Sequence, residues 1–216
     1  MEIFISHDTY DPAAAGREPG RHTSNFFGEV MATKKKQMDY AGKLPFSALH
    51  EIALKEARKI HREKVEHGVA IDEYGKVTPF GGNENAVDID VNKSTRITLH
   101  NHPHEFKEPS SFSGSDVYNL LHFGLEEIIV CGYGCIFYMR RGKCTSRAID
   151  VMHQIGKIYK NVELAEKKKF TEISLTDIDN INIHYRKMRV QIERNYHKAL
   201  KEYATEKGLS YRRVKL

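Results

Sequence analysis

Two histidines, His100 and His102, stand two positions apart at the end of a run with the composition of a strand. Side chains two residues apart in an extended strand leave the same face, so both imidazoles can reach one small ion. Asp116 falls in the first turn of the helix expected next, where its carboxylate can return to the same point. Two imidazole nitrogens and one carboxylate oxygen leave a fourth tetrahedral position for water, as in catalytic zinc sites. We therefore expect these three residues to bind Zn²⁺.

A zinc-activated water also needs a general base, and Glu66 is the preferred candidate. It lies where a predicted helix gives way to a strand, and from there a carboxylate can pass a proton from the water to a leaving amine. Glu63 and Glu73 remain alternatives, because Glu66 is chosen by position alone. Ser113 would donate a hydrogen bond to the developing oxyanion. A serine followed three residues later by an acid is also a helix-start signature, so Ser113 and Asp116 equally predict a capped helix.

Taken together, the residues form the pattern His-x-His-Pro at 100–103 and Ser-x-x-Asp at 113–116. This pattern resembles the JAB/JAMM (MPN-plus) family of zinc metalloproteases. The resemblance covers about residues 45–142, where helix, histidine-bearing strand, loop, helix and strand follow in the family's order. The His-Asn-His-Pro form is similar to bacterial RadC-type and to phage- or toxin-associated JAB-like domains, and less like the eukaryotic deubiquitinases.

The resemblance implies a zinc-dependent metallopeptidase or isopeptidase. It assigns zinc binding to His100, His102 and Asp116, the general base to Glu66, and transition-state support to Ser113. The loop at 103–112 is longer than is usual in the family. Insertions in surface loops cost little free energy, so the Ser-x-x-Asp unit can stay in place while the substrate groove changes.

The elements that must position these residues are indicated by hydrophobic periodicity. Apolar residues at helical spacing predict a helix from about 45 to 64, and a second helix is expected at 114–123 with Ser113 or Ser115 as its N-cap. Strands are expected at 68–72, from 77, at 86–91, 96–99, 127–133 and 135–140, the last two as a hairpin through Gly134. This order predicts an α/β (α+β) fold, a JAB/MPN-like mixed β-sheet flanked by helices.

Three segments are expected along the chain: an irregular N-terminal arm at 1–43, a JAB/JAMM-like metal-hydrolase domain at 44–147, and a helical basic C-terminal extension at 148–216. Residues 156–216 hold 15 Lys and Arg against 8 Asp and Glu, a net charge of +7 in a chain of net +5. An apolar stripe predicts a helix of about 30 residues that ends at Gly208. The stripe consists of Ile181, Tyr185, Met188, Ile192, Tyr196, Ala199 and Tyr203.

Composition narrows the protein class. The chain has 216 residues with 40% apolar and 29% charged side chains, which excludes a disordered chain, and no apolar run is long enough to cross a membrane. No secretory signal is evident at the N-terminus. The three cysteines are too few for a disulfide framework and favour the cytoplasm; Cys131 and Cys135 are expected as small buried residues of a strand. Of the 12 histidines, only His100 and His102 are singled out by a spacing that would let two imidazoles bind one metal ion.

The expected partners are a peptide or protein substrate, a nucleic acid or acidic partner through the basic C-terminal helices, and a second copy of the chain through the C-terminal helix. One alternative function is a non-catalytic JAB-like binding module of phage or mobile-element origin. A second is a metal-dependent nuclease, which metal-dependent nicking abolished by His100→Ala would identify. The adjacent letters His-Asn-His are a coincidence with the nuclease class of that name, whose residues are dispersed over a ββα-metal element.

Overall fold

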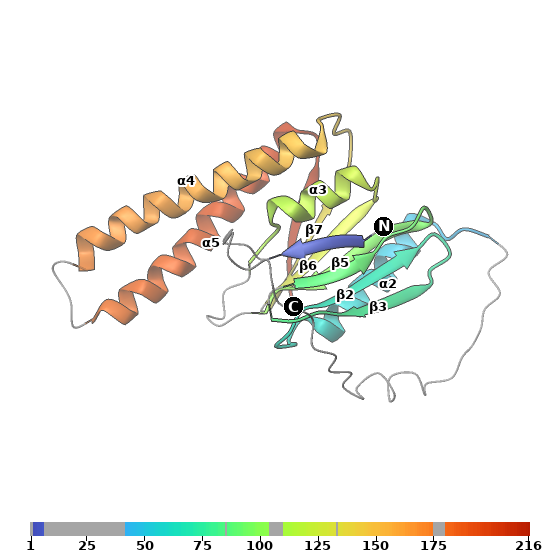
Figure 1. Ribbon diagram of the computed structural model, residues 1–216, viewed down its shortest axis with the longest axis horizontal. Helices are drawn as coiled ribbons and strands as arrows, with labels where there is room; N and C mark the ends of the chain where they lie inside the picture. The colour runs from blue at the N-terminus through green and yellow to red at the C-terminus, as the bar shows by residue number, and fades with distance from the viewer. Residues whose placement is uncertain (1, 7–41, 85, 104–109, 133, 175–179) are drawn as a thin grey trace.

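The protein was analysed as a computed structural model that describes residues 2–6, 42–84, 86–103, 110–132, 134–174 and 180–216. The described elements form a mixed α+β architecture with a six-stranded sheet and four helices (Figure 1). They are β1 (Glu2–Ser6), α2 (Phe46–Ile60), β2 (His67–Asp72), β3 (Val77–Gly81), β4 (Ala86–Asp90), β5 (Thr95–Asn101), α3 (Gly114–His122), β6 (Glu127–Gly132), β7 (Cys135–Arg140), α4 (Ala148–Ser174), α5 (Ile181–Glu206) and β8 (Ser210–Lys215).

The six-stranded sheet has the order β3-β2-β5-β6-β7-β8. Its central pair, β5 and β6, is parallel, and every other neighbouring pair is antiparallel. A parallel pair needs a crossover, and α3 supplies it between β5 and β6. The chain between the two central strands therefore carries a helix N-terminus back across the sheet, close to the end of β5.

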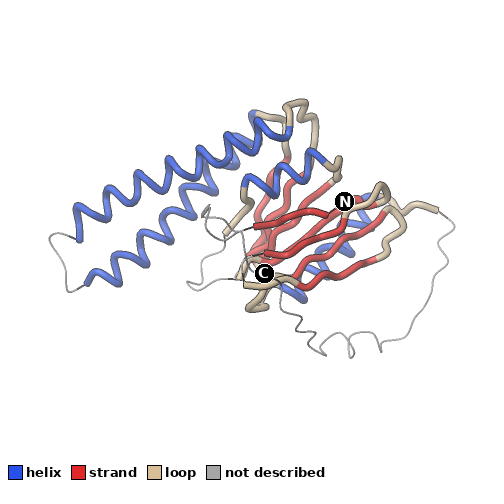
Figure 2. The backbone as a smooth tube through the Cα atoms, in the orientation of Figure 1, coloured by secondary structure: helices blue, strands red, loops and turns tan. Residues whose placement is uncertain are grey.

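Helices cover both faces of the sheet (Figure 2). On one face, α2 buries Leu49, Ala53 and Ala57 against a cluster that includes Ile97 and Leu99 of β5. On the other face, α3, α4 and α5 share a second cluster with residues of β6 and β7. Because side chains alternate along β5, the residues between and beyond Ile97 and Leu99 point to the α3 face, and His100 is one of them.

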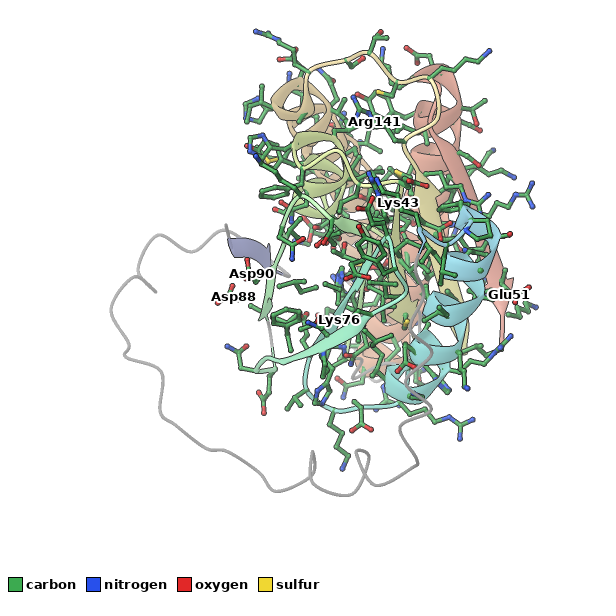
Figure 3. All side chains as sticks on the ribbon, turned by 90° about the vertical axis from the view of Figure 1, so that its right-hand side faces the viewer. Lys43, Glu51, Lys76, Asp88, Asp90 and Arg141 are labelled. Atoms are coloured by element: carbon green, nitrogen blue, oxygen red, sulfur yellow. The ribbon has the colours of Figure 1, made fainter. Side chains whose placement is uncertain are left out.

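A two-stranded ribbon of β1 and β4 packs against the α3 face near β2. Val87 and Ile89 of β4 are buried while Asp88 and Asp90 point outward (Figure 3), which confirms the alternation predicted for this strand. The ribbon approaches β2 so closely that a Cβ on Gly68 would lie 2.6 Å from Ile89 Cγ1. Residues 2–6, expected as part of an irregular arm at 1–43, form strand β1. Residues 1 and 7–41 of that arm lie outside the described residues.

The C-terminal third forms a long helical hairpin, α4 and α5, that projects from the sheet (Figure 1). The expected helical extension at 148–216 also contains a strand that the sequence reasoning did not predict: residues 210–215 form β8 at the sheet edge, hydrogen-bonded to β7. The apolar stripe on α5 is confirmed in its middle, where Met188, Ile192 and Tyr196 are buried. At its start Ile181 and Tyr185 are exposed. None of the described helices is both long enough and apolar enough to cross a membrane.

Candidate metal centre

His100, His102 and Asp116 come together at the end of β5 and the start of α3, and all three are buried. Their nitrogen and oxygen atoms lie within 4.8 Å of one another. His100 Nε2 is 2.9 Å from His102 Nε2 and 3.3 Å from Asp116 Oδ1. The structure thus places three possible metal-ligand atoms, one from each residue, close enough to bind one ion, as the spacing of the residues predicts.

The strand holds the two imidazoles in position. His100 is paired in register with Gly68 of β2 on one side and with Val130 of β6 on the other. His102 lies just past β5, where its backbone N–H donates a 2.8 Å hydrogen bond to the carbonyl of Cys131. Both backbones are therefore fixed from neighbouring strands. Burial lowers the pKa of His100 to about 3, so its imidazole is neutral, which is the form that coordinates a metal.

Ser113 and Asp116 form a capping box at the N-terminus of α3, as expected. The Ser113 N–H donates to Asp116 Oδ2 at 2.6 Å, and the Asp116 N–H donates to Ser113 Oγ at 3.2 Å. Asp116 therefore fixes its own orientation through Oδ2 and presents Oδ1 to His100. The Ser113 hydroxyl accepts in the cap, which leaves its hydrogen for another acceptor.

Glu66 is completely buried immediately before β2, two residues upstream of the residue paired with His100. Neither of its carboxylate oxygens has a hydrogen-bond partner among the described residues. Burial, followed by the negative charge of Asp116, raises the pKa of Glu66 to about 8. Since a buried carboxylate without partners is costly, this side chain indicates a site that takes a ligand or a proton.

The two alternative bases are placed differently. Glu73 follows the opposite end of β2, where its carboxylate contacts Lys43 Nζ at 2.9 Å and Arg96 Nη2 at 2.6 Å. Those two cations lower the pKa of Glu73. Glu63 is only half-buried and precedes the Glu66 segment. Of the three, Glu66 alone is buried at the His100 end of the strand.

Asn101 holds the segment that carries Glu66, a role that the sequence pattern did not predict. It is completely buried between the two histidines and points to the face opposite theirs. Its Oδ1 accepts a hydrogen bond from the His67 N–H at 2.6 Å, and its Nδ2 donates to the carbonyls of Val65 at 2.9 Å and Glu63 at 3.3 Å. One amide thus fixes the backbone on both sides of Glu66.

The C-terminal elements brace the other side of the site. Tyr196 of α5 donates a buried 2.6 Å hydrogen bond from its hydroxyl to the carbonyl of Phe112, next to Ser113. Tyr211 of β8 has its phenol 2.5 Å from His197 Nδ1 and packs edge-on against the Phe112 ring. The extension is therefore part of the scaffold of the site, and only contacts far apart in the sequence reveal this.

No family model, curated protein or solved structure matches the chain. The chemistry of the site is therefore indicated by its possible ligand atoms, their burial and the Glu66 carboxylate, whose oxygens have no hydrogen-bond partner among the described residues.

Proposed function

We propose that the protein is a zinc-dependent hydrolase that cleaves a peptide or isopeptide bond, with His100, His102 and Asp116 as the metal ligands. The observation that carries this proposal is a buried three-donor cluster beside a buried glutamate whose oxygens have no described partner. Two imidazoles and one carboxylate are the ligand set of catalytic zinc, which retains an open position. When bound there, zinc lowers the pKa of a coordinated water and polarises a carbonyl.

Glu66 acts as the general base. Before a cation binds, the pKa of about 8 keeps this carboxyl largely protonated near neutral pH. A cation close by opposes the effect of the Asp116 charge and favours the ionised carboxylate, which is the form that accepts a proton from water. The protonated Glu66 then returns this proton to the leaving amine. Burial without competing hydrogen bonds suits both steps, because no other group holds the carboxylate away from the reacting atoms.

Ser113 and Asn101 support the reaction from either side. The Ser113 hydroxyl hydrogen, not used in the capping box, donates to the oxyanion that develops on the attacked carbonyl. Asn101 is a positioning residue, because its three hydrogen bonds hold the backbone that carries Glu66. Adjacent residues at the end of β5 thus provide two of the proposed zinc ligands, His100 and His102, and, through Asn101, hold the segment that carries Glu66.

The deciding experiment measures bound metal and hydrolysis on the same protein samples. We expect about one zinc per wild-type chain and none in the His100→Ala/His102→Ala double variant, as measured by plasma emission spectrometry. The wild-type, but not the variant, should cleave members of a panel of fluorogenic peptides and lysine-linked isopeptides. Absence of metal from both proteins after purification in zinc-containing medium would overturn the proposal.

A further inference from the structure

Five exposed cations lie along one side of α5, far from the metal centre in the sequence. This group, the α5 stripe, consists of Arg186, Lys187, Arg194, Lys198 and Lys201. Their spacing places them within about one third of the helix circumference, and from first to last they extend over about 22 Å at the rise of an α-helix. The opposite side of α5 buries Met188, Ile192 and Tyr196 against the rest of the protein. The five side chains of the stripe are exposed to solvent. The helix that carries them belongs to the hairpin that projects from the sheet (Figure 1).

One exposed acid, Glu202, follows the stripe at its C-terminal end, and no exposed acid lies within the stripe itself. Between residues 181 and 201 the only acid is Glu193, and it is buried. None of the five cations forms an ion pair within the described part of the chain. On α4, by contrast, Lys167 pairs with Glu163 at 3.0 Å and Lys169 pairs with Glu166 at 2.5 Å. Solvated helix faces commonly intersperse both signs of charge, as α4 does, so the excess of positive charge on this part of α5 indicates an anionic partner.

A shallow surface pocket lies between the side chains of the stripe. A pocket of about 560 Å³ is lined by Ile183, Arg186, Lys187, Val190, Gln191 and Arg194. These positions step along one side of α5 over three helical turns, so the hollow follows the helix axis. Three of the five cations, Arg186, Lys187 and Arg194, line this pocket, so an elongated anion lying along the helix can contact all three.

We propose that the α5 stripe binds the phosphate backbone of double-stranded nucleic acid. A length of 22 Å faces about six phosphates of one strand, which is enough for every cation of the stripe to make a contact. A second copy docked through the same surface would bring like charges together, because a two-fold interface places a patch on itself. Single strands are usually held by aromatic stacking, but the stripe has no aromatic residue, and Tyr185 next to it packs against Phe170.

The test compares three full-length proteins by fluorescence anisotropy with a labelled 30-base-pair duplex of arbitrary sequence at several salt concentrations. In the test variant, Arg186, Lys187 and Arg194 are each changed to Gln. In the control variant, the exposed cations Lys55, Arg58 and Arg62, on and just after α2, are changed to Gln, which gives the same change in net charge on the other face of the sheet. Matching thermal unfolding of the three proteins confirms that the fold is intact.

We expect the wild-type and the control variant to bind the duplex with micromolar affinity near 0.1 M salt, and the test variant at least tenfold more weakly. The slope of log affinity against log salt should fall in magnitude by about 2 to 3 in the test variant, one unit for each lost phosphate contact. Equal weakening in both variants, or no binding by the wild-type, would overturn the proposal. So would displacement of the duplex by poly-L-glutamate at equal charge concentration, since the stripe would then fit an acidic polypeptide. The result does not depend on whether the metal centre is catalytic.

Discussion

Two buried glutamates at opposite ends of β5 have opposite surroundings. Glu127 begins β6 and is paired in register with Ile97, near the start of β5; Glu66 lies near His100, at the end of β5. Both side chains are completely inaccessible to solvent. Glu127 Oε1 accepts a 2.8 Å hydrogen bond from Arg140 Nε, and Oε2 lies 2.5 Å from His50 Nδ1. Neither carboxylate oxygen of Glu66 has a hydrogen-bond partner among the described residues.

The difference lies in whether the buried charge is balanced by its surroundings. Desolvation of a carboxylate is normally offset by hydrogen bonds or an ion pair, and Glu127 has both. The Arg140 guanidinium is itself held 4.5 Å from the centre of the Phe46 ring, so this end of the sheet is a fixed network. The end with Glu66 has a carboxylate without hydrogen-bond partners near three possible metal ligands, an arrangement that costs stability and on which the proposed hydrolysis depends.

The largest expected effect is on hydrolysis in Glu66→Gln. Loss of a general base lowers the rate by about 10²- to 10⁴-fold. The bound zinc should remain, because the three ligands are unchanged, and the free energy of unfolding should stay equal or rise, because a neutral amide costs less to bury than a carboxylate. Activity assays, metal analysis and urea unfolding on the same sample measure the three quantities.

Glu127→Gln is the matched control for this variant. It removes the charge that Arg140 and His50 contact, so we expect a loss of about 1 to 3 kcal/mol of stability and hydrolysis within about twofold of wild-type. Two results would contradict the different roles of the two glutamates: hydrolysis that persists in Glu66→Gln, or similar losses of stability and activity in both variants.

The second prediction concerns the pH dependence of stability in protein stripped of metal by a chelator. In the folded state Glu66 holds its proton up to about pH 8, whereas in the unfolded chain it loses it near 4.5. Between these values the folded state binds more protons, so its stability decreases as the pH rises, by at most about 1.4 kcal/mol per pH unit. In urea unfolding at pH 5 to 8, the free energy of unfolding of Glu66→Gln should therefore rise steadily relative to that of the wild-type as the pH increases. A constant difference between the two across this range would contradict the raised pKa.

A third, smaller effect is expected for Asn101→Ala. Loss of its three hydrogen bonds to the Glu66 segment should cost about 2 to 3 kcal/mol of stability. At temperatures where the variant is fully folded and zinc-loaded, the maximal rate of hydrolysis should still fall at least tenfold, with the Michaelis constant little changed. A purely structural role would lower the unfolding midpoint and leave the rate per bound zinc at the wild-type value.

The metal-type cluster was predictable because each of its parts follows a local rule. The two-residue period of a strand places His100 and His102 on one face, and a serine three residues before an acid predicts the cap that orients Asp116. The helix at α2 and the strands β2 to β7 likewise follow from short hydrophobic patterns. The sequence prefers Glu66 to Glu73 by position alone. Only the structure shows that Glu66 lies at the end of β2 beside His100, whereas Glu73 follows the opposite end.

Elements that depend on distant pairing could not be predicted. Strand β8 has one buried residue, Tyr211, among exposed and cationic ones, so its sequence lacks a strand's alternation; it is held in place by the edge of β7. Strand β1 similarly pairs with β4, eighty or more residues away. Tyr196 fits a helical apolar stripe equally well with or without its bond to Phe112. A single sequence contains no signal for such contacts, although one of them braces the loop before Ser113.

The smallest expected effect concerns the hydrogen bond from the Tyr196 hydroxyl to the Phe112 carbonyl. Tyr196→Phe keeps the ring in the core and removes only the hydroxyl that donates to the Phe112 carbonyl, so stability should fall by about 1 kcal/mol. Tyr203→Phe is the matched control, since this half-buried tyrosine of the same helix makes no hydrogen bond through its hydroxyl to a described residue. Because Phe112 precedes Ser113, the Tyr196 variant should also lose hydrolysis severalfold while retaining zinc, and the control should not. Equal unfolding midpoints and equal rates in the two variants would show that the C-terminal hairpin supports the fold without acting on the site.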